Sequence, residues 1–104
     1  MQNRAQNMLT RGLPNSTDDA YQIIKKHSDA PKITPNMNLK RDLGLDSITV
    51  YMIIYEIENH YSIQMPDDNR YTTVQDIILA TSTAINERNK RLKDFMGTRD
   101  NLSR

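Results

Sequence analysis

Residues 46–61 read DSITVYMIIYEIENHY, and this stretch decides the fold. Its apolar residues recur at intervals of three and four, which is the spacing of one face of an α-helix. Asp46 can cap the backbone N–H groups of the first turn. We therefore expect a helix from Ser47 to about Tyr61 with one apolar stripe facing a core. That stripe consists of Val50, Ile53, Ile54, Ile57 and Tyr61.

The same helix carries a second apolar surface at a different angle around its axis. Four residues form this arc, with Glu58 as its main polar interruption: Ile48, Tyr51, Met52 and Tyr55. A helix that is apolar on two sides is either buried on both or presents one side to a partner. We interpret the arc, together with Glu58, as a partner-binding surface. The alternative is that the long loop or a short helix near residues 67–71 covers it.

Upstream of this stretch the sequence predicts one shorter helix and one long loop. Ser16 or Thr17 can cap the helix, and Asp18 and Asp19 follow in its first turn, where the helix dipole favours anions. Its apolar face is expected at Ala20, Ile23, Ile24 and His27. Residues 30–46 then form a loop whose length usually indicates a function. Its apolar residues should anchor it on the bundle: Ile33, Met37, Leu39, Leu43 and Leu45.

Downstream, the sequence MPDD predicts a short helical turn near residues 67–71. Thr72 is expected to cap a last helix, with Gln75 as the other half of a capping box. The buried stripe of that helix is Val74, Ile77, Ile78, Thr81 and Ile85. We expect it to run as far as Met96, because Gly97 is the first strong stop signal. The predicted fold is all-α: a small bundle of three main helices plus a short fourth, with a long loop between helices one and two.

Charge is unevenly distributed along the 104 residues. Residues 1–15 carry two arginines and no acid, residues 16–85 carry ten acidic and six basic residues, and residues 86–104 carry six basic and three acidic residues. We therefore expect a flexible N-terminal tail (1–15), one domain (16–85) and a basic C-terminal extension (86–104), in which the last helix continues and then gives way to disorder. Nucleic-acid binding through the basic ends is the less favoured alternative, so no nucleic-acid partner is expected.

The composition excludes several kinds of site. The chain has no cysteine, so it has no disulfide, no thiolate metal ligand and no thiol nucleophile of its own. No apolar run approaches the roughly 20 residues of a membrane span, and the N-terminal MQNR leads into no signal-peptide segment. We expect a cytoplasmic monomer without a metal site or a membrane span.

The segment before the central helix carries a family resemblance. Residues 42–48 read DLGLDSI, which resembles the Asp-Ser-Leu signature of acyl carrier proteins, with isoleucine in place of leucine. The similarity extends from about residue 16 to residue 85 and includes the proline-containing loop, the segment from Tyr61 to Pro66 and Thr72-Thr73-Val74. The signature also lies at the matching place in the expected order of helices.

The resemblance implies a carrier that is not an enzyme and has no catalytic residue of its own. A separate phosphopantetheinyl transferase, the holo-carrier synthase, would attach a 4′-phosphopantetheine arm from coenzyme A to Ser47. The start of a helix also favours a phosphate ester on physical grounds, and Asp46 would cap it and contact the transferase. Acyl-loading and acyl-processing enzymes would be the other partners. The implied acyl pocket is lined by Val50, Ile54, Ile57, Ile63 and Val74.

The central helix departs from the family pattern, because fatty-acid carriers are strongly acidic there. Thr49 and Met52 stand at positions that often hold acids, and Tyr51 and Tyr55 occupy the face that meets partners. These differences favour a carrier in specialised lipid or polyketide synthesis over the housekeeping carrier of fatty-acid synthesis. Two alternatives stay open: a peptidyl or aminoacyl carrier, and a helical interaction module that works unmodified, with Ser47 as a plain capping residue.

Overall fold

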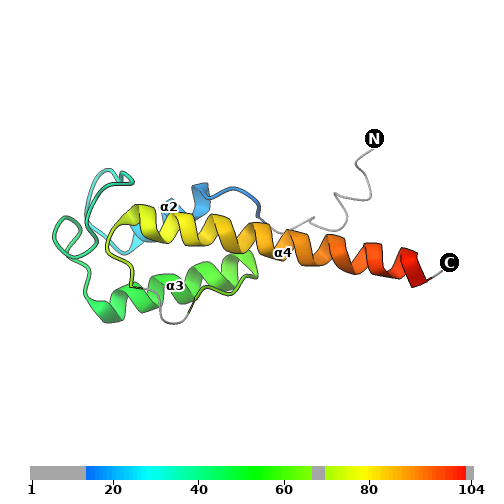
Figure 1. The fold of residues 1–104 in the computed structure, drawn as a ribbon. Coiled ribbons are helices and arrows are strands. Elements are labelled where there is room, and N and C mark those ends of the chain that lie inside the picture. Colours follow the sequence, from blue (N-terminus) through cyan, green and yellow to red (C-terminus); the bar gives the residue numbers. More distant parts are fainter. Residues whose placement is uncertain (1–13, 67–69, 103–104) are drawn as a thin grey trace.

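The protein is all-helical in the residues that the structure describes. The computed structural model describes residues 14–66 and 70–102, with side chains up to residue 95. Its helices are α2 (Asp18–Lys26), α3 (Ser47–Tyr61) and α4 (Val74–Leu102). Figure 1 shows α3 and α4 running side by side in the same direction, with α2 packed against both in the opposite direction. Those ranges contain no strand, and one isolated antiparallel bridge joins Asn38 to Thr73. The three main helices expected from the sequence are confirmed.

Helix α3 forms the centre of the core. Ile53, Ile57 and Tyr61 are buried, as the spacing predicted, while Val50 and Ile54 of the same stripe are only partly buried. The helix ends at Tyr61, and the capping residue Ser62 adopts the left-handed conformation (φ 55°) and donates its N–H to the carbonyl of Glu58. One apolar stripe therefore anchors the helix along its length and leaves two of its residues accessible.

Helix α2 is fixed to the end of α3 by one side chain. The hydroxyl of Tyr61 accepts the N–H of Ala20 at 2.9 Å and donates to the carbonyl of Ser16 at 2.7 Å. Burial raises the pKa of this phenol above its usual value. Ser16 accepts the N–H of Asp18 at 3.1 Å, and the side chain of Thr17 makes no capping bond. Of the two capping candidates, Ser16 is therefore the one that satisfies a backbone donor.

Three ion pairs bind α2 and the residue that follows it to the exposed side of α3. Glu56 accepts from Nε2 of His27 at 3.0 Å and also pairs with Lys26. These bonds hold the pKa of Glu56 below its ordinary value, with His27 as the larger cause. His60 pairs with Asp19 at 2.9 Å. Both histidines of the chain therefore connect helices.

The long loop is tied to the start of α4. Leu39 donates its N–H to the carbonyl of Thr72 at 2.9 Å, and Val74 donates to the carbonyl of Met37 at 3.0 Å. Leu39, Leu43 and Leu45 are buried, while Ile33 and Met37 pack partly buried against the core. The expected anchoring of the loop by its apolar residues is confirmed.

The start of α4 corrects one prediction. Asp76 accepts the N–H groups of Thr72 and Thr73 at 2.9 and 3.0 Å, and Thr73 Oγ1 accepts the N–H of Asp76 at 3.2 Å. The capping box is therefore formed by Thr73 and Asp76, one residue later than the predicted pair of Thr72 and Gln75. Thr73 pairs with Asn38 in the isolated bridge, and the helix begins at the next residue.

The end of α4 corrects a second prediction. The helix passes through Gly97 and runs to Leu102, instead of ending near Met96. A glycine stops a helix by adopting positive φ just past its last turn. Inside a helix it only lowers the helical preference, by about 1 kcal/mol relative to alanine.

Arg88 on α4 bonds to two other segments of the chain, the end of α3 and the segment before α2. Its guanidinium is buried and donates to the carbonyl of Tyr61 at 2.6 Å and to Oδ1 of Asn15 at 2.8 Å. Asn89 donates to the same oxygen at 2.9 Å. Desolvation lowers the pKa of Arg88 below its usual value. This cation therefore lies at the C-terminus of α3, where the exposed carbonyls attract positive charge.

Two predictions concern residues outside the described ranges. Residues 67–69 lie outside them, and Arg70 and Tyr71 are not helical, so the expected short fourth helix is not shown. Residues 1–13 of the expected flexible tail also lie outside, whereas Asn15 is bonded to α4. The boundaries at residues 15 and 85 stay predictions.

The bonds of Tyr61 predict a stability difference. Tyr61→Phe should lower the free energy of unfolding by about 0.5–1.5 kcal/mol, because a buried hydroxyl loses two hydrogen bonds while the N–H of Ala20 still reaches the carbonyl of Thr17. Urea denaturation measures the change. Tyr55→Phe is the matched control, since the Tyr55 ring is 67% exposed. Equal stability of the two variants would contradict the anchoring role of the Tyr61 hydroxyl.

Candidate functional site

The site is built at the start of α3, where the loop delivers Asp46 and Ser47 to the surface. Leu43 and Leu45 are buried on either side of Gly44, where the chain turns. Gly44 has φ +66°, a conformation that side-chain-bearing residues rarely adopt. The N–H of Leu45 donates to the carbonyl of Leu39 at 2.9 Å. The next two residues are thereby exposed at a fixed position.

Asp46 caps the helix as predicted. It is in extended conformation, and its Oδ1 accepts the N–H of Thr49 at 2.8 Å. Its carbonyl accepts the N–H of Val50 at 3.0 Å. The bond from Thr49 lowers the pKa of the Asp46 carboxyl, because it stabilises the ionised form. Ser47 is consequently the first residue of a well-formed helix, at its positive end.

Ser47 combines exposure with a favourable field for an anion. The first N–H groups of a helix have no partner within the helix and attract negative charge. A phosphate ester on the Ser47 hydroxyl would project from the surface beside these groups. In the described part of the chain, both histidines are paired with carboxylates of α2 and α3, so neither lies beside Ser47 as a base. The described residues also contain no group of three His, Cys, Asp or Glu side chains that could hold a metal ion.

A cavity of about 710 Å³ opens beside Ser47 and continues along α3. Val50 and Ile54 line it, as expected for an acyl pocket, and the buried side chains of Leu39, Leu45 and Met65 lie along it. Ile57, Ile63 and Val74 were expected there too, but they are buried in the core and do not line this cavity. Sequence reasoning missed further lining residues, which come from loops without helical periodicity: Asn38, Lys40, Pro66, Arg70, Tyr71 and Thr72.

The apolar arc of α3 is exposed. Ile48, Tyr51, Met52 and Tyr55 are each between 53% and 71% exposed, so the described loop does not cover them. They border a shallow hollow of about 500 Å³ together with His27, Glu56 and Asn59. Tyr51 and Tyr55 also line the cavity beside Ser47, and therefore form a ridge between the two depressions.

We expected Glu58 to belong to the partner-binding surface together with the arc, but its side chain makes a bond within the chain. Its Oε2 accepts the N–H of Met65 at 2.8 Å, which fixes the segment after α3. It also lines the cavity beside Ser47, on the other side of the tyrosine ridge from Met52. The residue therefore has a structural bond within the chain, and its partner-binding role stays a prediction.

Comparisons with known proteins place the segment that contains this site in a family. Residues 22–80 match the family described as "Phosphopantetheine attachment site". "Acyl carrier protein 2, mitochondrial" from Arabidopsis thaliana is 33% identical over 66 residues, which cover 62% of this chain and 52% of the relative. "Acyl carrier protein" from Treponema denticola is 35% identical over 67 residues, covering 57% of this chain and 86% of the relative. "Putative acyl carrier protein, mitochondrial" from Schizosaccharomyces pombe is 40% identical over 55 residues, covering 51% and 49%. No solved structure matches.

The fold and the match define a phosphopantetheine carrier, whose cofactor is a covalently attached 4′-phosphopantetheine. The chain belongs to the acyl carrier protein family. It spans about half the length of the plant and fission-yeast relatives and most of the bacterial one. None of its described helices is long and apolar enough to cross a membrane. Two of these relatives are named as mitochondrial, so the expected cytoplasmic location stays a prediction.

The cap predicts a pH-dependent contribution of Asp46 to stability. Because its pKa is lowered in the folded state, the contribution is present above the unfolded value of about 3.9 and is lost as pH falls through the lower folded value. The melting temperature of Asp46→Ala should therefore lie below that of the wild type at pH 6, with a smaller difference at about pH 2.5. Thermal unfolding across this range measures both. The exposed loop residue Asp29, changed to alanine, is the control. A difference that stays constant with pH would contradict the ionised cap.

Proposed function

We propose that this protein holds acyl intermediates as thioesters on a 4′-phosphopantetheine arm attached to Ser47, in fatty-acid, specialised lipid or polyketide synthesis. The observation that carries the proposal is the exposed Ser47 at the capped N-terminus of α3, inside the segment that matches the attachment-site family. The arm supplies the thiol on which an acyl group is carried, and the chain itself contains no cysteine.

The residues of this chain contribute position and electrostatics. Asp46 and the turn at Gly44 fix the helix start, so that the Ser47 hydroxyl is presented to a transferase. The positive end of α3 favours the phosphodiester that forms there. In the described ranges no histidine lies beside Ser47 as a base, so the phosphopantetheinyl transferase would supply the group that accepts the hydroxyl proton. The partner enzymes also perform the acyl chemistry.

The cavity beside Ser47 is the proposed site for the first part of the cargo. Val50 and Ile54 present apolar surface there, and the cavity begins at the attachment residue. Ile57, Ile63 and Val74 lie deeper in the core, so a chain that reached them would have to separate α3 from α4. We propose that the loaded chain follows the surface from Ser47 past Val50 to Ile54, with Ile57, Ile63 and Val74 as the inner wall of an expanded pocket.

Partner enzymes are proposed to dock on the apolar arc of α3. Its residues are exposed and adjoin the cavity beside Ser47. Tyrosine is favoured at protein interfaces because it buries a large apolar area with few rotatable bonds. Glu56, the acidic residue of the adjoining hollow, is already paired with Lys26 and His27. The partner's surface is therefore proposed to be largely apolar, in keeping with a specialised pathway.

Attachment at Ser47 is tested by intact-protein mass spectrometry. Incubation with coenzyme A, magnesium and a broad-specificity transferase should add one phosphopantetheine unit to the wild type and none to Ser47→Ala. Ser82→Ala, a serine within α4, is the control and should be loaded like the wild type. Loading of Ser47→Ala, or an arm mapped to another serine, would refute the proposed site. Failure of the wild type to gain mass would favour an unmodified interaction module.

If the arc is the docking face, replacing its tyrosines should slow acyl loading without unfolding the domain. Tyr51→Ala and Tyr55→Ala should leave the melting temperature nearly unchanged, because both rings are exposed. Acyl loading by the cognate enzyme should slow by on the order of tenfold, the size expected for an interface anchor. Leu79→Ala is the matched control, since Leu79 is a 56% exposed apolar residue on α4.

The salt dependence of enzyme binding tests whether the contacts of the same face are largely apolar. With few charged pairs to screen, affinity for the enzyme should weaken less than about threefold as salt rises to about 0.15 M. A collapse of binding over that range, or unfolding of both tyrosine variants, would show that this account of recognition is wrong.

A further inference from the structure

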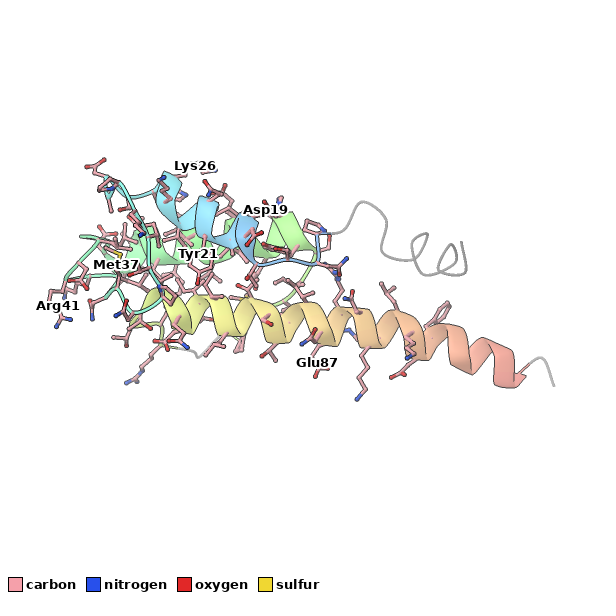
Figure 2. All side chains as sticks on the ribbon, turned by 90° about the horizontal axis from the view of Figure 1, so that it is seen from above. Asp19, Tyr21, Lys26, Met37, Arg41 and Glu87 are labelled. Carbon is pink, nitrogen blue, oxygen red and sulfur yellow. The ribbon has the colours of Figure 1, made fainter. Side chains whose placement is uncertain are left out.

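A second hollow, of about 620 Å³, lies between α4 and the segment that follows α3. Residues 64–66 form one wall, and side chains of α4 form the other, three of which are small: Ala80, Thr83 and Ala84. Figure 2 shows Glu87, at the rim of this hollow, on the side of α4 that faces away from α2. Most of the α4 residues that line it lie beyond residue 80, where the match to the attachment-site family ends.

This second hollow shares a wall with the cavity beside Ser47. Met65 and Pro66 line both depressions, and no other described residue does. Pro66 is exposed, whereas Met65 is only 2% exposed. The buried part of the wall between the two depressions is therefore a single methionine side chain.

The surface of α3 that leads away from Ser47 ends at this methionine. Val50, Ile54 and Glu58 follow one another at intervals of four residues along one face of the helix, and all three line the cavity. Oε2 of Glu58 accepts the N–H of Met65 at 2.8 Å. Covering the Glu58 carboxylate with an apolar chain is unfavourable, because it removes water from a charge. Met65 is thus the apolar surface on which a chain that has passed Ile54 can continue.

The side chain of Met65 can turn aside while its backbone stays fixed by Glu58. Methionine has three rotatable bonds and adapts to irregular spaces. Its sulfur lies 4.0 Å from the hydroxyl of Thr81, and that hydroxyl donates to the carbonyl of Ile77 at 2.7 Å. Thr81 keeps this shorter bond when the methionine moves, so its buried hydroxyl does not lose its partner.

We propose that Met65 is a side-chain gate, and that a long acyl chain turns it aside and places its apolar end in the second hollow. This inference rests on the proposed attachment of the arm to Ser47. A short chain ends against Val50 and Ile54 and leaves Met65 in place. The end of a long chain lies against Ala80 and Ala84, so the cargo class that uses both depressions is a long, unbranched acyl group.

The gate offers a long chain a route that keeps the helices together. A chain that entered the core instead would pass Ile57, Ile63 and Val74, which are buried, and would have to separate α3 from α4. Close-packed interiors resist such a separation. Displacement of one methionine side chain leaves the contacts between the helices in place.

Nuclear magnetic resonance of the loaded carrier tests where the chain ends. A broad-specificity transferase loads the full chain from octanoyl or hexadecanoyl coenzyme A labelled with ¹³C at the terminal methyl, and mass spectrometry confirms the loading. The terminal methyl of the octanoyl chain should show nuclear Overhauser contacts to Val50 and Ile54. That of the hexadecanoyl chain should show them to Ala80 and Ala84.

The other outcomes of this measurement each have a defined meaning. Contacts of the hexadecanoyl methyl with Ile57, Ile63 or Val74 would overturn the gate in favour of entry into the core. A hexadecanoyl methyl without contacts to the protein would overturn it in favour of cargo held outside. Both results leave attachment at Ser47 standing, whereas a chain that gains no mass would refute the proposed function and this inference with it.

Melting temperatures of loaded variants test the second hollow and the gate separately. Thr83→Trp fills the hollow from an exposed position, and Asn86→Trp, also exposed on α4 but outside the hollow, is its control. Met65→Ile keeps an apolar side chain that is stiff at its first torsion angle. The hexadecanoyl chain should raise the melting temperature by about 5 °C more than the octanoyl chain in the wild type and in Asn86→Trp. Thr83→Trp and Met65→Ile should lose this difference and respond normally to octanoyl, and equal differences in all four proteins would overturn the proposal.

Discussion

The hydroxyl of Tyr61 joins the first helix to the end of the central one, and the arrangement of the bundle depends on that junction. The same residue's carbonyl accepts from buried Arg88, which also holds Asn15. Three segments far apart in the sequence thus meet at one end of the molecule through a phenol and a guanidinium. Buried polar groups of this kind stabilise one arrangement because leaving any of them unpaired is costly. None of these bonds of Tyr61 and Arg88 reaches the opposite end, where Ser47 lies.

The end of the molecule that carries Ser47 is organised by backbone geometry and short-range bonds. A loop anchored by leucines, one glycine with positive φ and an aspartate cap deliver Ser47 to the surface. Beside it lies a cavity whose walls come partly from loops. The two ends therefore differ in construction: one is held by the buried bonds of Tyr61 and Arg88, and the other exposes Ser47 beside a cavity.

Local patterns were sufficient to predict α3, its cap and the exposure of its second apolar arc, because helical periodicity and capping depend on neighbouring residues. They also placed Val50 and Ile54 at the cavity. They failed where a distant segment decides the outcome. At the start of α4, Thr73 pairs with Asn38 in the bridge, and the capping residue is Thr73 instead of the predicted Thr72. Ile57, Ile63 and Val74 are apolar like cavity residues, and only the packed fold shows that they are enclosed. Nothing in the sequence around Arg88 indicated that its charge would be buried.

Helix α4 separates the two ends of the molecule by its own length, which is about 43 Å for 29 residues. Ser47 begins α3 at the end from which α4 also starts, whereas the C-terminal end of α4 points away from it (Figure 1). A fluorophore, an affinity tag or a solid support joined to that far end would leave Ser47, the proposed attachment serine, facing the solution. The protein could therefore be immobilised as an oriented layer, with the arm proposed for Ser47 presented outward to whichever enzyme is passed over it.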